Sequence, residues 1–158
     1  MADAQALEFS SVHALGSGGG YFSSVLKPAT PTDADAWVWL AYDQLHPSML
    51  SSLSLDGTVG VVLIESSAKA KRRPYHQQKL GVLLSNQRHF AVELQDAGTP
   101  VVYVSTHEGY GEALASLTAE VGPIHCIRAA ERELREEVAS LVEDGRLVAV
   151  SYTHLTLP

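Results

Sequence analysis

Five largely apolar runs lie along the chain, and their nearly continuous hydrophobicity constrains the fold more than any other feature. Runs that are apolar at every position indicate strands covered on both faces, whereas half-exposed strands alternate apolar and polar residues. Segments with helical character separate the runs, and such alternation is typical of a parallel sheet. The runs cover residues 37–41, 58–64, 100–104, 124–127 and, as the weakest, 146–150.

The clearest helix is predicted over residues 75–97, where apolar side chains form one stripe and Gly98 follows as a stop signal. The stripe consists of Leu80, Leu83, Leu84, Phe90, Ala91 and Leu94. Shorter helices are expected over 47–53, 111–121 and 130–143. The sequence therefore predicts an α/β fold, with a doubly wound, Rossmann-like parallel sheet of four to five strands and helices on both faces.

Composition divides the chain into three parts. Residues 1–35 are expected to form a flexible N-terminal extension, because Gly16–Gly20 and scattered prolines favour a loose chain. Residues 36–150 hold all the predicted strands and form one α/β domain. Residues 151–158, read with Val150 as VSYTHLTLP, resemble a translated sequencing adapter. We interpret this segment as a non-native tail, with an ordinary strand end as the alternative.

Charge and cysteine content limit the function. Lysine and arginine total 11 against 18 aspartates and glutamates, which gives a formal charge of −7. A domain this acidic repels phosphates, so strong nucleic-acid binding by this chain alone is not expected. The single cysteine, Cys126, excludes an internal disulfide and fits a reducing compartment. No membrane span or secretory signal is found, so a cytoplasmic protein is expected.

Two carboxylates follow neighbouring strands of the predicted sheet. Asp43 comes after the first run and Glu65 after the second. In open parallel sheets, ligands bind beyond the carboxyl ends of the strands, so these side chains are candidates to accept hydrogen bonds from a ligand. An alternative stays open, in which Asp43 caps the short helix that follows it.

Other polar clusters allow a structural and a functional interpretation. Lys69, Lys71, Arg72 and Arg73 either contact a nucleic-acid backbone or form a solvated loop. Arg88–His89 falls within the longest helix, where a half-buried position is the simpler interpretation. The histidines lack metal-binding spacing, so no metal site is predicted. Ser105 and His107 lack a G-x-S-x-G turn, and no catalytic residue is predicted. Cys126 lies in a predicted strand and is expected to be an inert buried thiol.

Several motifs match one family in order along the chain. The strand and turn at 37–45 (WVWLAYDQL), the strand end at 61–65 (VVLIE) and the helix start at 76–80 (HQQKL) carry part of the resemblance. The most specific match is 85–94 (SNQRHFAVEL), and 130–135 (AERELR) completes the set. Together they resemble the N-terminal domain of the photolyase/cryptochrome family, in its photolyase-related branch of iron–sulfur cryptochromes and (6-4) photolyases.

The resemblance implies a function for residues 36–150. Family members hold a light-harvesting antenna, 6,7-dimethyl-8-ribityllumazine, in this domain. They bind FAD, a 4Fe–4S cluster and UV-damaged DNA in a helical C-terminal domain, where a light-driven lyase reaction reverses the lesion. Carried over by position, the antenna ligands are Asp43, Gln44 and Glu65, with Leu80 as an apolar wall. A chain with one cysteine cannot hold the cluster, so it is expected to be an inactive fragment of such a flavoprotein.

The sequence departs from the family pattern at two places, and alternative functions stay open. Tyr42 stands where most members have glycine before the DQL turn, which marks a subgroup or a reshaped pocket. The end of the second strand, 65–68 (ESSA), is poorer in acids and aromatics than is usual in the family. The main alternative is a stand-alone α/β nucleotide-binding or sensory module, although no glycine-rich phosphate loop follows a predicted strand. A scaffold for protein contacts is the third interpretation.

Overall fold

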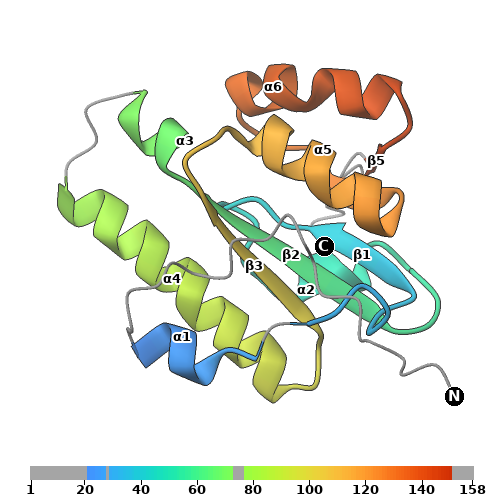
Figure 1. Cartoon of the computed structure of the whole chain (residues 1–158), viewed down its shortest axis with the longest axis horizontal. Coiled ribbons are helices and arrows are strands. Elements are labelled where there is room, and N and C mark those ends of the chain that lie inside the picture. Colours follow the sequence, from blue (N-terminus) through green and yellow to red (C-terminus); the bar gives the residue numbers. More distant parts are fainter. Residues whose placement is uncertain (1–20, 28, 73–76, 151–158) are drawn as a thin grey trace, which may run out of the picture.

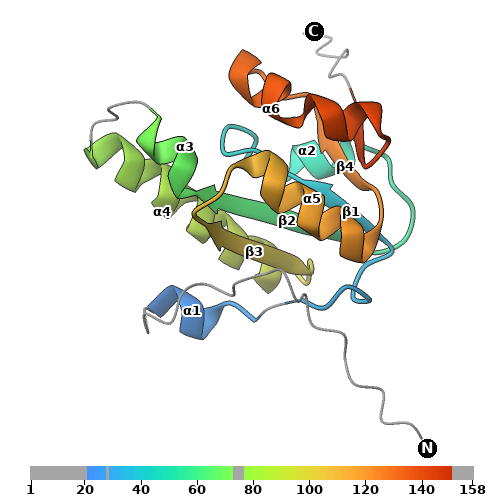
Figure 2. The ribbon, with the colours of Figure 1, turned by 45° about the horizontal axis from the view of Figure 1, so that its top comes forward.

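Parallel strands form one sheet in the computed structural model, which describes residues 21–27, 29–72 and 77–150. Their order across the sheet is β3-β2-β1-β4-β5, and every neighbouring pair is parallel (Figures 1 and 2). The predicted doubly wound α/β class is thereby confirmed. The strands are β1 (Ala36–Trp39), β2 (Val59–Ser66), β3 (Val101–Thr106), β4 (Ile124–Ile127) and β5 (Leu147–Val150).

Helices cover both faces of the sheet, as the strand pattern predicted. Helices α5 and α6 lie on one face, and α4 lies on the other with α1 and α2 (Figures 1 and 2). The short α3 follows β2 directly. The helix bounds are α1 (Tyr21–Val25), α2 (Ser48–Ser51), α3 (Ser67–Lys71), α4 (Gln77–Asp96), α5 (Tyr110–Val121) and α6 (Arg132–Glu143).

Alternate residues of β1, β2 and β3 serve two separate cores, which explains the continuous apolar runs of these strands. In β1, Trp37 and Trp39 pack beneath α5 and α6, whereas Val38 packs beneath α4. The same alternation continues in β2, where Val62 joins the first core and Val61 the second. Burial on both faces removes nearly all of these side chains from water, and this burial drives folding.

Part of the predicted N-terminal extension is packed rather than loose. The ring of Phe22 in α1 meets Tyr103 edge-on, with ring centroids 4.9 Å apart. The Gln95 side chain accepts from the Lys27 backbone N–H at 2.6 Å and donates to the Val25 carbonyl at 3.0 Å. Ala29 N–H also donates to the Val101 carbonyl at 3.3 Å, on the outer edge of β3. The glycines and prolines of this segment indicated a loose chain, so the sequence pattern did not predict that its apolar side chains would pack.

Several predicted features fall outside the described residues. These are the glycine run within residues 1–20, Arg73 and His76, and the segment 151–158 interpreted as a tail. Within the described ranges, none of the helices combines the length and hydrophobicity that a membrane crossing requires.

The close packing of β2 against β1 generates a first prediction, at Gly60. A Cβ atom built on Gly60 would lie 2.9 Å from the Ala34 Cβ and closer still to the Trp37 ring. We expect Gly60→Ala to destabilise the fold by about 1–3 kcal/mol, the usual cost of overpacking. Urea unfolding measures this cost as a lower midpoint.

The matched control is Gly81→Ala on α4, where a Cβ would meet nothing within 4 Å. Alanine is the better helix former there, so this variant should gain about 0.5–1 kcal/mol. Equal midpoints for the two alanine variants would contradict the described contact between the strands.

Candidate functional site

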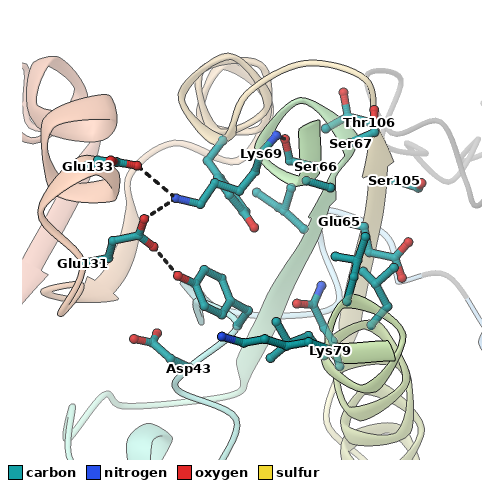
Figure 3. Close-up of a pocket in the computed structure, with 18 of the residues that line it drawn as sticks. Asp43, Glu65, Ser66, Ser67, Lys69, Lys79, Ser105, Thr106, Glu131 and Glu133 are labelled. Atoms are coloured by element: carbon teal, nitrogen blue, oxygen red, sulfur yellow. Dashed lines mark hydrogen bonds and ion pairs between the residues drawn. The ribbon is translucent and has the colours of Figure 1, made fainter. Parts of the chain in front are cut away.

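A cleft of about 930 Å³ opens at the carboxyl ends of the strands. Its walls come from the turn after β1, the ends of β2 and β3, helices α3 and α4, and the loop between β4 and α6 (Figure 3). This is the edge at which a doubly wound sheet binds ligands, beside the switch point between β1 and β4. The polar lining residues include Asp43, Glu65, Ser66, Ser67, Lys69, Lys79, Ser105, Thr106, Glu131 and Glu133.

The structure brings three of the residues predicted from the sequence to this one cleft. Asp43, Glu65 and Leu80 all line it, from the turn after β1, from β2 and from α4 respectively. Asp43 does not cap the following helix, because Pro47 occupies the N-cap of α2 and no side chain caps it. That alternative for Asp43 is therefore wrong. Whether these residues contact a ligand stays a prediction.

Gln44 lies apart from the other candidates. It is buried and is not among the residues that line the cleft. Its amide oxygen accepts from the Ala41 backbone N–H at 3.2 Å, and its amide nitrogen donates to the Ile127 carbonyl at 3.2 Å. Gln44 therefore ties the turn after β1 to the end of β4. The geometry gives it a structural role at the switch point.

Glu65 lies in a hydrogen-bond network at the wall of the cleft. Its carboxylate accepts two hydrogen bonds from the Arg88 guanidinium, at 2.6 and 3.0 Å, and a third from the Tyr103 hydroxyl. A fork-to-fork pair of this kind is stronger and more directional than a single ion pair. The Arg88 guanidinium also lies 5.5 Å from the centre of the Phe22 ring. The network thus links the cleft to α1.

The same contacts shift the titration of the network. Burial and the neighbouring Glu65 carboxylate raise the pKa of the Tyr103 phenol well above its usual range. The hydrogen bonds to Glu65 raise the pKa of Arg88 further. Arg88 is partly buried, as predicted from its position in the helix. The neighbouring His89 is exposed, so the half-buried position predicted for it is wrong.

A second network closes the opposite side of the cleft. Lys69 in α3 is only 7% exposed, and its Nζ pairs with Glu131 and lies 3.9 Å from Glu133. The other oxygen of Glu131 accepts from the Tyr42 hydroxyl. Burial and this hydrogen bond raise the pKa of the Tyr42 phenol well above its usual range. Figure 3 shows Lys69 reaching between the two glutamates.

Burial of Lys69 corrects the interpretation of the basic cluster. The segment was expected to contact nucleic acid or to form a solvated loop, but Lys69 lies inside the protein and pairs with acids. Arg72 is half-exposed and donates to Glu137 at 3.3 Å. These two charges are therefore largely neutralised within the domain. Among the described residues of this cluster, Lys71 is exposed without such a pair.

The polar groups of the cleft fall into two classes. Glu65, Lys69 and Ser66 are engaged in contacts within the protein. Among the described residues, Asp43, Lys79 and Ser105 line the cleft without a hydrogen-bond or ion-pair partner. In Figure 3, Lys79 extends from α4 towards the side on which Asp43 lies. An acceptor and a donor therefore face the same space from two walls.

The first turns of α4 give the cleft an apolar wall. Leu80, Leu83 and Leu84 are partly exposed and line the cleft, whereas Phe90 and Leu94 on the same stripe are buried in the core. The single stripe predicted for this helix therefore serves two purposes. Its N-terminal part faces the cleft because α4 extends beyond the carboxyl edge of the sheet (Figure 1).

Sequence reasoning missed Lys79 as a residue open to a ligand and Glu131 as part of the site. Ser105 sits at the carboxyl end of β3 and is among the positions that the strand-end rule indicates from the sequence. Lys79 immediately precedes Leu80 on a helix expected to border the site. Glu131 had no local signal, because its partner Lys69 is 62 residues away in the chain.

Cys126 behaves as the sequence predicted. It is 3% exposed, and burial raises the pKa of its thiol to about 11. A thiol of this kind stays protonated and unreactive near neutral pH. A single buried cysteine does not fit an iron–sulfur cluster, so no chemistry of this chain is assigned to one.

The Glu65–Arg88 pair generates a prediction for stability. Arg88→Met leaves a carboxylate that is only 9% exposed without its bidentate partner. We expect a loss of about 2–3 kcal/mol, less than for a fully buried pair because Arg88 itself is 43% exposed. Denaturant unfolding provides the measurement.

The control is Arg132→Met, which removes the exposed pair with Glu136 on α6. Surface pairs of this type contribute about 0.5 kcal/mol or less. Equal losses in the two variants would mean that Glu65 is solvated rather than held in the described network.

Alkaline pH generates another prediction. The unfolded chain ionises its phenols near the ordinary pKa of 10.0, whereas the folded chain keeps Tyr42 and Tyr103 protonated. Unfolding then releases protons, so stability is complete below about pH 10 and falls as the pH rises above it. Tyr103→Phe should reduce this fall. Unfolding midpoints compared between about pH 8 and about pH 11 test it, and an unchanged pH dependence in the variant would contradict the assignment.

Comparison with known proteins identifies a family that fits the observed fold. No curated protein sequence matches the chain. The family model described as deoxyribodipyrimidine photo-lyase-related protein matches residues 38–156, which is more than half of the chain. The match contains every strand from β2 to β5, the second half of β1, and both Asp43 and Glu65. The chain therefore belongs to the family of deoxyribodipyrimidine photolyase-related proteins.

Proposed function

We propose that this domain holds the light-harvesting chromophore of a photolyase or cryptochrome flavoprotein, with 6,7-dimethyl-8-ribityllumazine as the ligand class. The observation that carries the proposal is the shared cleft of Asp43, Glu65 and Leu80, at the edge where such a sheet takes ligands. The family membership supports it, because the cleft lies within the matched residues.

The chemistry of the cleft fits a heteroaromatic ring that carries a polyol. Its volume of about 930 Å³ is within the range of small-molecule sites. The leucines of α4 provide an apolar wall for a flat ring. Asp43 accepts a hydrogen bond from a ring or chain donor, and Lys79 donates to a carbonyl oxygen from the other wall. The hydroxyl of Ser105 matches a ribityl chain.

Lesion repair belongs, in this proposal, to a second domain that is not part of the 158 residues. FAD, the 4Fe–4S cluster and the contacts with UV-damaged DNA are assigned there. Two features of this chain support the division. Its formal charge of −7 disfavours contact with phosphates, and its single cysteine is buried in β4. The antenna domain alone is then expected to transfer excitation energy and to have no lyase activity.

Lumazine titration tests the proposal. We expect saturable absorbance changes when the 158-residue chain is titrated with 6,7-dimethyl-8-ribityllumazine. Asp43→Asn should weaken binding by about tenfold to a hundredfold, because a hydrogen bond to a charged group is lost. The matched control is Asp56→Asn, which removes an exposed carboxylate that does not line the cleft.

The outcomes separate the candidate functions. A folded wild-type chain that shows no saturable change with the lumazine contradicts the chromophore proposal. Saturable binding of ATP or AMP in the same cleft, with no lumazine binding, would favour the alternative of a nucleotide-binding or sensory module. Equal affinities of the Asp43 and Asp56 variants would remove Asp43 from the site.

A further inference from the structure

Tyr42 presents the aromatic surface of the cleft. Two tyrosines belong to its lining, Tyr42 and Tyr110. Tyr110 is only 5% exposed, and its ring lies 5.9 Å from that of Trp39 in the core. Tyr42 is half-buried and packs against the same core while it also lines the cleft. One side of Tyr42 therefore rests on the protein interior, and the remainder is open to a ligand.

The orientation of the Tyr42 ring is set by the charged side chains of Glu131 and Lys69. Its hydroxyl donates to Glu131, whose other oxygen accepts from the buried Lys69. Glu131 occupies the N-cap position of α6 but makes no capping hydrogen bond with its side chain. Its carboxylate is directed to Tyr42 and Lys69 instead. Because a buried ammonium without its acid is costly, this arrangement resists rearrangement.

The fixed orientation of the Tyr42 ring favours stacking on a ligand. A mobile tyrosine side chain loses conformational entropy when a ligand binds, whereas a side chain that is already fixed loses much less. Flat heteroaromatic rings pair with phenol rings in offset or edge-on geometry. The leucines of α4 lie on another wall of the same cleft, so a ring system between them contacts an aromatic and an aliphatic surface.

We infer that Tyr42 is the stacking residue for the heteroaromatic ring of the bound ligand, with Glu131 and Lys69 as positioning residues that hold its plane. The inference rests on the proposed function, since it requires a ring-bearing ligand in this cleft. It adds a determinant of selectivity, because a polyol or sugar without the ring gains nothing from Tyr42.

Two substitutions of Tyr42 separate the ring from the hydroxyl. Tyr42→Phe keeps the ring but loses the hydrogen bond to Glu131 that positions it, so it should bind 6,7-dimethyl-8-ribityllumazine more weakly than wild type by no more than about threefold. Tyr42→Leu removes the ring and should bind it about three- to tenfold more weakly, the contribution of one aromatic pair. The absorption band of bound lumazine should keep its wild-type position in the phenylalanine variant. In the leucine variant it should move towards its position in water.

A double-mutant cycle tests the positioning role of Glu131. Glu131→Gln should weaken lumazine binding when Tyr42 is present and have no effect in the Tyr42→Leu background. Circular dichroism and unfolding midpoints of each variant show that the fold is retained. A merely structural role for Glu131 would instead lower affinity equally in both backgrounds.

The results distinguish failure of the inference from failure of the proposed function. If the wild-type chain binds the lumazine and Tyr42→Leu binds it with the same affinity and the same absorption band, the stacking role is overturned and the chromophore proposal stands. A loss of tenfold or more in a folded Tyr42→Phe variant also overturns it, because the hydroxyl would then be the contact. A folded wild-type chain that does not bind the lumazine overturns both.

Discussion

Parallel pairing of β1 with β2 is the constraint on which the site depends. The register places Trp39 beside Val62, so both strands leave the sheet at the same edge. Asp43 and Glu65 then follow from these two strands into one cleft, although they are 22 positions apart in the sequence. Gly60 permits this pairing at close range, since a side chain there would collide with Trp37. An antiparallel or shifted pairing would separate the two carboxylates.

Most charged side chains at the cleft are paired within the protein, so few are available to contact a ligand. The Glu65–Arg88 and Lys69–Glu131 pairs neutralise the charges closest to the interior, which lowers the cost of burying them. The rigid frame this creates surrounds the unpaired Asp43 and Lys79. Selectivity for a ligand then comes from a small number of free polar groups, an apolar wall and one fixed phenol, instead of from net charge.

The strands, the main helices and the shared edge could be predicted from the sequence because they depend on local periodicity and a general rule of parallel sheets. The partners of the site residues could not. Arg88 is 23 residues from Glu65, and Tyr42 is 89 residues from Glu131, so no local pattern reports these contacts. Gln44 shows the same limit within one turn. Its position beside Asp43 suggested a ligand-binding role, but its amide bonds to the backbone of Ala41, just after β1, and of Ile127 in β4.

Packing of α1 illustrates a different limit. The composition of residues 1–35 predicted a loose extension, yet Phe22 and Leu26 pack beside Tyr103 and α4. Their burial follows from the exposed flank that β3, an edge strand, presents to the chain. Glycine and proline content reports backbone freedom, but it does not report whether a nearby surface offers apolar contacts.

Backbone amide chemical shifts, recorded with and without 6,7-dimethyl-8-ribityllumazine, test most directly whether the carboxyl edge of the sheet is the binding site. The account predicts that the shifts change at Tyr42, Asp43 and Lys79 and at the ends of β2 and β3. Residues at the opposite edge, such as Asp35, Gly57 and Gly98, should keep their positions. Changes confined to that opposite edge, or spread evenly over the domain, would contradict a ligand site built on the pairing of β1 with β2.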